Sequence, residues 1–454
     1  MTPIVQRRFA MAVAIGPVFS ILLASLGTSI ANVALPEMAA GLSAPFATVQ
    51  WVVIGYLLSL TVLSAAAGRL GDRIGHGRAL RLGMVAFTVG AGAAAMAPQV
   101  GWLIAARMVQ GAGAAAMIVL PMALLRETAD PARLGRAMGF LGTASAVGTA
   151  LGPALGGVLI AGFGWRAVFW VMLALGGLGL ATVQSTGAKP KAQAAMDLRP
   201  AVLLAVAVAG VALAATLRDG WISIALLGLS GVAALLFRKV DERSAQPFFP
   251  AGAMGAEVLR RGLIANALVA AVMMTMLVVS PFFLARGLGL QAGAVGMAMT
   301  LGPALSAASG IPSGRLVDRW GAAPVARLGV VLMLLAVAVI AAGTQVAGLW
   351  GFLAGVVFLT PGYQLFLAAN TTQVLMTAGE AQRGATSGLL GLSRNLGLIA
   401  GAAVMAALFG WATGSGDAAQ ADPAVVVWAT GGTFAAAAAL LIAAVALLRP
   451  DVRK

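Results

Sequence analysis

The feature that most constrains this sequence is a succession of long apolar segments separated by short loops. A helix that crosses a membrane needs about 20 mostly apolar residues, and fourteen segments meet that requirement. They lie near 9–33, 47–67, 79–97, 101–125, 136–161, 165–185, 199–217, 221–237, 262–284, 292–312, 326–343, 348–376, 384–410 and 424–447. Only 9% of the residues are charged, which is too few to cover a soluble protein of this length. The sequence therefore predicts an all-α membrane protein.

The positions of lysine and arginine predict how these segments are oriented. If the N-terminus lies inside, 24 of the 29 basic residues fall in inner segments, as the positive-inside rule requires. We therefore expect a multi-pass protein of the cytoplasmic (inner) membrane with both termini cytoplasmic. The net charge of +15 is then a topology signal. Nucleic acid is not an expected partner, because a duplex binder gathers its basic residues on one face.

Two internal repeats predict the domain organisation. The first repeat has identical residues 246 positions apart at Gly68/Gly314, Arg69/Arg315, Asp72/Asp318, Arg73/Arg319, Arg81/Arg327 and Gly83/Gly329. The second has identical residues 249 positions apart at Gly135/Gly384, Gly139/Gly388, Gly142/Gly391, Gly148/Gly397 and Gly152/Gly401. In each repeat, the matching segments are eight helices apart along the chain. Two six-helix bundles that follow each other directly would place matching helices six apart. We therefore expect six-helix bundles at 1–186 and 256–454, with two inserted helices and their cytoplasmic loops at 187–255.

Four short motifs occur in order along the chain. They are the N-V-A-L-P run at 32–36, the basic loop at 68–78, Arg107-x-x-Gln110-Gly111-x-Gly113, and the G-x-x-x-G-P-x-x-G-G run at 148–157. Together they resemble the motifs of the major facilitator superfamily, specifically its fourteen-span drug:proton antiporters, and the resemblance covers nearly the whole chain. It implies the major facilitator fold and secondary active transport by alternating access, with efflux of small amphipathic or toxic compounds.

Two regions are candidates for gating. Gly68 has no side chain, so helices can approach closely there, and Asp72 can accept hydrogen bonds from arginines or from a helix N-terminus. The alternative is that the basic residues only fix the topology. The glycines near 148–157 form a stripe suited to close packing, which in the resembled family closes the outer side, and simple tight packing is the alternative. The gating candidates are Gly68, Arg69, Asp72, Arg73, Gly148, Gly152, Pro153, Gly156, Gly157, Gly314, Asp318 and Arg319.

Two arginines lie within apolar segments, where a charge is costly unless it faces water or is paired. We expect Arg107 to face a water-filled cavity, with a structural bond to backbone carbonyls as the alternative. For Arg394, substrate contact and internal pairing are equally open. The substrate-cavity candidates are Asn32, Tyr56, Arg107, Gln110, Asn266, Asn370, Arg394 and Asn395.

The proton-coupling site departs from the resembled family. Those antiporters carry an aspartate where this chain has Gly27, and none of the fourteen acidic residues lies in the middle third of an expected span. The only histidine, His76, lies in the loop at 68–81. Glu37 is the first remaining candidate for a proton carrier and Asp219 the second. Whether protons are coupled at all is left open.

Other classes of function find no support in the sequence. There is no G-x-x-x-x-G-K-[ST] loop to bind ATP, and no metal or nucleophile constellation, so we expect neither an enzyme nor a cofactor. The expected partners are a small-molecule substrate and the lipid bilayer, with protons as an open third, and the monomer is the expected working unit. One rival is a lipid or lipid-linked flippase on the same fold, which would use a lateral opening. A non-transporting membrane sensor is the second rival, and the lack of a cytoplasmic output domain argues against it.

Overall fold

The computed structural model describes residues 3–128, 134–183, 199–217, 220–244, 257–377, 383–414 and 421–448. Across these ranges every regular element is a helix. Twelve helical stretches within them are long and apolar enough to cross a membrane. The two remaining expected segments are occupied by α5 (His76–Ala95) and the shorter apolar helix α8 (Arg166–Thr182). The all-α membrane architecture is confirmed, while the count of fourteen spans remains a prediction.

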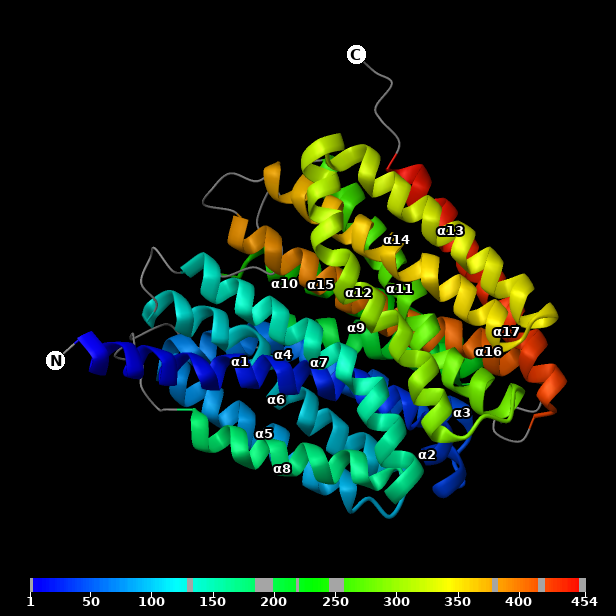
Figure 1. Ribbon diagram of the computed structural model, residues 1–454, viewed down its shortest axis with the longest axis horizontal. Coiled ribbons are helices and arrows are strands. Elements are labelled where there is room, and N and C mark those ends of the chain that lie inside the picture. The colour runs from blue at the N-terminus through cyan, green and yellow to red at the C-terminus, as the bar shows by residue number, and fades with distance from the viewer. Residues whose placement is uncertain are drawn as a thin grey trace.

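The helices before residue 184, here called the first half, pack side by side (Figure 1). They are α1 (Pro3–Val33), α4 (Trp51–Ile74), α5, α6 (Val100–Thr128), α7 (Leu134–Phe163) and α8. Two short helices, α2 (Leu35–Gly41) and α3 (Phe46–Val49), follow α1 and lie at the opposite end of the molecule from the start of α1. We call this end of the molecule the α2–α3 end.

The helices after residue 256, here called the second half, make a similar assembly. They are α11 (Glu257–Phe282), the π-helix η3 (Phe283–Gly287), α12 (Ala292–Trp320), α13 (Ala322–Val346), α14 (Leu349–Met376), α15 (Arg383–Ala400), the π-helix η5 (Gly401–Met405), α16 (Ala406–Ala412) and α17 (Pro423–Leu447). Asp422 precedes the last of these, and its carboxylate accepts a hydrogen bond from the backbone N–H of Ala424 at 2.8 Å. This is a side-chain cap for an otherwise unpaired helix N-terminus.

Between the halves, α9 (Arg199–Thr216) and α10 (Gly220–Glu242) pack on each other as a pair. The pair is attached through α9, which contacts α4, α15 and η5. The indole N–H of Trp51 on α4 donates to the hydroxyl of Thr216 on α9 at 3.2 Å. The expected boundaries at 186/187 and 255/256 lie outside the described residues, so the three-part division stays a prediction.

The structure corrects the expected loop at 68–81. Helix α4 continues to Ile74 and α5 begins at His76, so Gly75 is the only residue between them. Gly75 has φ 96°, and Gly321, 246 positions later, has φ 82° between α12 and α13. Glycine adopts such a backbone without the clash that a Cβ would cause. The basic motif of each half therefore lies on two helix ends that meet at one glycine.

Candidate functional site

The two halves meet at the α2–α3 end through aromatic rings. Phe46 of α3 lies edge-on to Phe282 of α11, with 4.6 Å between ring centroids, and to Phe409 of α16 at 5.4 Å. All three side chains are fully buried. Edge-to-face pairs of this kind add to the stabilisation that burial provides. Phe46 of the first half therefore packs between aromatic side chains of the second half.

A backbone contact closes the same region. Gly157 of α7 and Gly296 of α12 touch so closely that a Cβ added to Gly157 would lie 2.6 Å from the Cα of Gly296. The carbonyl oxygen of Pro153, one turn earlier, would lie 2.7 Å from a Cβ added to Gly296. Only glycines permit this approach of two helices. We call this contact the α7–α12 seam.

The other expected gating glycines of α7 face the first half. A Cβ added to Gly148 would collide with the Leu22 carbonyl oxygen of α1, and one added to Gly152 would collide with Ser29. Gly156 packs against Ile30 of the same helix. The expectation that the whole stripe closes one half against the other is therefore corrected: Gly148, Gly152 and Gly156 pack on α1, while Pro153 and Gly157 lie against α12.

At the far end, the glycines with which the two basic motifs begin make no tight contact. The atom nearest to a Cβ added to Gly68 is Cγ1 of Val119, 3.7 Å away in the same half, and no atom lies within 4 Å for Gly314. Asp318 and Arg319 are exposed. The close approach of helices expected at Gly68 and Gly314 is therefore absent in this conformation.

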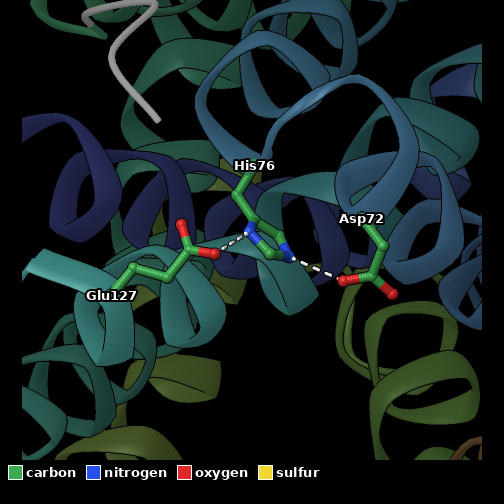
Figure 2. Close-up of polar contacts among 3 residues, drawn as sticks. All are labelled: Asp72, His76 and Glu127. Atoms are coloured by element: carbon green, nitrogen blue, oxygen red, sulfur yellow. Dashed lines mark hydrogen bonds and ion pairs between the residues drawn. The ribbon is translucent and has the colours of Figure 1, made fainter. Parts of the chain in front are cut away.

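Three side chains from three helices form a cluster at this far end, which Figure 2 shows. Nδ1 of His76 on α5 lies 2.9 Å from Oε1 of Glu127 on α6, and its Nε2 lies 3.3 Å from Oδ1 of Asp72 on α4. A neutral imidazole has one N–H, so only the protonated ring donates to both carboxylates. Asp72 is therefore tied within its own half.

This His76 cluster is specific to the first half. The positions that correspond to His76 and Glu127 by the two repeats hold Ala322 and Met376. His76 follows Asp72 by four residues in the sequence, and no sequence pattern links either residue to Glu127. Of the other basic gating candidates here, Arg73 is exposed and Arg69 is half-buried.

Arg107 is completely buried in the first half. Its Nε donates to the Val52 carbonyl at 3.1 Å, one terminal nitrogen to the Gly27 carbonyl at 3.0 Å, and the other to Oε1 of Gln110 at 2.6 Å. The guanidinium also lies over the ring of Tyr56, 4.1 Å from its centroid, a favourable cation–π arrangement. The expectation of a cavity-facing Arg107 is wrong for this conformation, because carbonyl oxygens and a ring enclose the charge.

Four further cavity candidates are also buried between helices. The Tyr56 hydroxyl donates to the Ala24 carbonyl at 2.9 Å, and Gln110, also fully buried, contacts Met172. In the second half, Asn266 donates to the Leu390 carbonyl at 2.9 Å and Asn370 to the Gly262 carbonyl at 3.1 Å. These residues join helices within one half and do not line an open site.

Asn32 is corrected in the same way. It is buried near the end of α1, and its amide nitrogen donates to the carbonyls of Thr28 and Ser29 on its own helix. The amide therefore stabilises the last turns of α1 and does not face an open site.

Arg394 and Asn395 are placed differently. Arg394 is exposed and Asn395 is half-buried, both on α15. The opposite face of α15 packs on α11, where the Ser393 hydroxyl donates to the Leu263 carbonyl and Gly397 lies against Ala267. Of the eight cavity candidates, Arg394 alone has an exposed side chain.

The acidic candidates give no buried proton site among the described residues. Glu37 is exposed on α2, and Asp219 lies outside the described ranges. No group of three or more histidine, cysteine, aspartate or glutamate side chains in the described part of the chain has the geometry to hold a metal ion.

A cavity lies away from all these residues. It has a volume of about 670 Å³ and lies between the α9–α10 pair and α16. Its walls are mostly apolar and include Val211, Leu227, Val404 and Trp411. No sequence pattern predicts it, because it depends on how the inserted pair packs against the second half.

Comparison with known proteins identifies the architecture. The family model described as Major Facilitator Superfamily matches residues 18–258 and 262–454. The solved structure of the peptide transporter POT in complex with sulfate superposes with a TM-score of 0.72, covering 97% of each chain at 16% identity. That likeness shows the fold.

Two curated relatives give a finer comparison. The multidrug resistance protein Stp of Mycobacterium tuberculosis is 30% identical over 395 residues, covering 84% of this chain and 72% of that protein. The tetracenomycin C resistance and export protein of Streptomyces glaucescens is 31% identical over 271 residues, covering 57% of this chain. The match spans only about half (49%) of the tetracenomycin protein's own length.

Proposed function

Because the chain belongs to the Major Facilitator Superfamily, we propose that it is a secondary active exporter that works by alternating access. The observation that carries the proposal is the contact of the two halves at the α2–α3 end, through Phe46 and at the α7–α12 seam. Alternating access requires two end states in which a central site is open to one side only. In the proposed cycle, this contact closes one side of the protein in one such state.

Export of small amphipathic or toxic compounds is supported by the relatives. One is named for tetracenomycin C resistance and export and the other for multidrug resistance. The glycine and proline pattern of α7, which resembles the antiporter motif, supports the same proposal. The proposal therefore places the chain among the drug antiporters of the inner membrane, with the substrate and the bilayer as its partners and the monomer as the working unit.

The α9–α10 pair is proposed to supply two extra spans, giving fourteen with both termini cytoplasmic. The chain has no cysteine, so single cysteines report topology without background. A cysteine at Ser43, beside α2, should react with an impermeant thiol reagent in intact cells. One at Ser244, after α10, should react only after permeabilisation. Labelling of the Ser244 position in intact cells contradicts the fourteen-span arrangement.

Protons are proposed as the coupling ion, with Glu37 and Asp219 as the candidate carriers. A carrier must change charge as it moves between the two sides. Glu37→Gln removes the titratable group and preserves its size. If Glu37 carries the proton, this variant loses uphill export and keeps downhill exchange of substrate.

Export itself is tested in cells that express the protein and are loaded with a panel of neutral, anionic and cationic dyes. Energised cells that express the wild type should lose at least one dye faster than cells that express the Gly157→Leu variant. A protonophore should abolish this difference in the rate of dye loss. Equal loss of every dye from the two strains overturns the proposal.

A flippase remains the second candidate because of the apolar cavity beside the α9–α10 pair. Such a protein needs a lateral opening for a lipid chain, and this cavity is mostly apolar and lies between helices at the edge of the second half. Replacing Leu227 with Trp would fill it. Loss of lipid movement without loss of dye export would assign the cavity to lipid.

A further inference from the structure

Arg394 occupies the exposed face of α15, far from either end of its span. Eleven residues separate it from the start of α15 at Arg383, which corresponds to about 16 Å along a helix. No hydrogen bond or ion pair of its side chain occurs among the described residues. It is therefore a lone positive charge at the depth of the membrane interior.

The surroundings of Arg394 are open and polar. No atom lies within 4 Å of a Cβ added to Gly388 or Gly391, which precede it on the helix. Ser387, two turns before Arg394 on the same face, is exposed as well. By contrast, Gly397 and Gly401 are in tight contact with α11. The open side of α15 thus carries small and polar residues, and its packed side carries the contacts to α11.

Contact between lipid tails and this face of α15 would be unfavourable. A guanidinium in the hydrocarbon interior costs about 2.5–3.5 kcal/mol even on insertion scales, and arginines at this depth usually face water or a partner. Helix α15 lies beside the first half and the inserted pair, since it contacts α4 and α9. The open face of α15 is therefore best explained as a face that contacts water.

Among the described residues, no carboxylate pairs with Arg394. The described acidic residues lie at or near helix ends, among them Asp72, Glu127, Glu257 and Asp318. Arg107, the other arginine within an expected span, is buried and enclosed by carbonyls and by Tyr56. Of these two arginines, Arg394 is therefore the one whose charge is accessible.

We propose that Arg394 is a substrate-binding residue that selects compounds carrying an anionic group, such as a carboxylate, over lipophilic cations. The guanidinium offers several N–H donors in a plane that matches a carboxylate or a phosphate. Asn395 adds an amide beside it. This inference rests on the proposed export function and names its substrate class.

Binding is measured first, with purified protein and two fluorescent probes, anionic carboxyfluorescein and cationic ethidium. The wild type should bind carboxyfluorescein more tightly than ethidium. Arg394→Gln should weaken carboxyfluorescein binding at least about tenfold, as expected for loss of a unit charge in a site of intermediate dielectric, and Arg394→Lys should weaken it less than about threefold. Arg243→Gln, which removes an exposed arginine at the end of α10, is the matched control and should change nothing.

Transport in liposomes then separates this inference from the export function. Unchanged probe affinities in a monodisperse Arg394→Gln protein overturn the role of Arg394, even if both dyes are exported. Failure of the wild type to move any dye, with binding still dependent on Arg394, leaves the anion site standing and removes the export function. A parallel arm with labelled phosphatidylglycerol identifies a lipid headgroup as the source of the anion if the lipid moves and carboxyfluorescein does not.

Discussion

Arg107 donates a hydrogen bond of 3.0 Å to the backbone carbonyl of Gly27. Gly27 stands where the resembled antiporters carry an aspartate, so a backbone oxygen accepts from the cation at the helix position where a carboxylate would otherwise lie. The Val52 carbonyl and Gln110 complete its set of acceptors. The buried charge is thereby held without an acidic partner, and it joins α1, α4 and α6 into one unit.

Arg107→Ala should therefore cost stability. Hydrogen bonds to charged groups contribute about 1.5–3 kcal/mol each, and the variant leaves two buried carbonyls and one amide oxygen without this donor. We expect the melting temperature of the purified protein to fall by about 5 °C or more. Arg394→Ala, which removes an arginine that has no partner among the described residues, should shift it by less than about 2 °C. Equal shifts for the two variants would show that Arg107 is not the structural residue described here.

Asp72→Asn should slow transport by at least about threefold at normal expression. The change weakens the contact between Asp72 and His76 and so loosens the corner at which α4 and α5 meet, since a bond between charged groups is worth roughly 1.5–3 kcal/mol. Asp318→Asn at the same position of the second repeat is the control, because Asp318 is exposed and its half has no histidine there. If the two variants behave alike, the cluster has no special part in the transport cycle.

The His76 cluster should stabilise the packing of α4, α5 and α6. The charged groups that face the ring are Asp72 from α4 and Glu127 from α6. His76→Ala removes both contacts, so the melting temperature of the purified protein should fall by about 2 °C or more.

Arg78→Ala is the matched control, because Arg78 is an exposed residue on the same helix. It should shift the melting temperature by less than about 1 °C. Equal shifts for the two variants would mean that the contacts of the ring with the two carboxylates do not stabilise the protein.

Gly157→Leu should abolish transport without preventing folding. The added side chain would occupy the space now taken by Gly296, so the halves could no longer close at the α7–α12 seam. Gly162→Leu serves as control on the same helix, because no atom lies within 4 Å of a Cβ added there. Dye export from cells should be lost in the first variant and retained in the second. Full activity of Gly157→Leu would show that the seam does not have to close.

The sequence predicted the helices well because each apolar segment contains the information for its own span. The repeat at 246 positions also recurs in the structure, as the paired turns at Gly75 and Gly321 show. Periodicity does not reveal which neighbour each polar residue contacts. Polarity at depth predicts a cavity for Asn266, Asn370 and Arg107, yet backbone carbonyls of adjacent helices accept their hydrogen bonds. No sequence pattern points to Phe46 or Glu127, because their partners lie far away in the chain.

The proposed function requires that this protein move a soluble compound across the membrane with an ion gradient as the driving force. Purified protein in liposomes that contain no ATP shows whether it does so, when the movement of dyes, labelled lipids and protons is recorded in parallel. We predict that an imposed proton gradient drives a dye against its own gradient, that a proton flux accompanies it, and that Gly157→Leu stops both. Lipid movement without dye movement, or dye movement that does not depend on the proton gradient, would contradict this function.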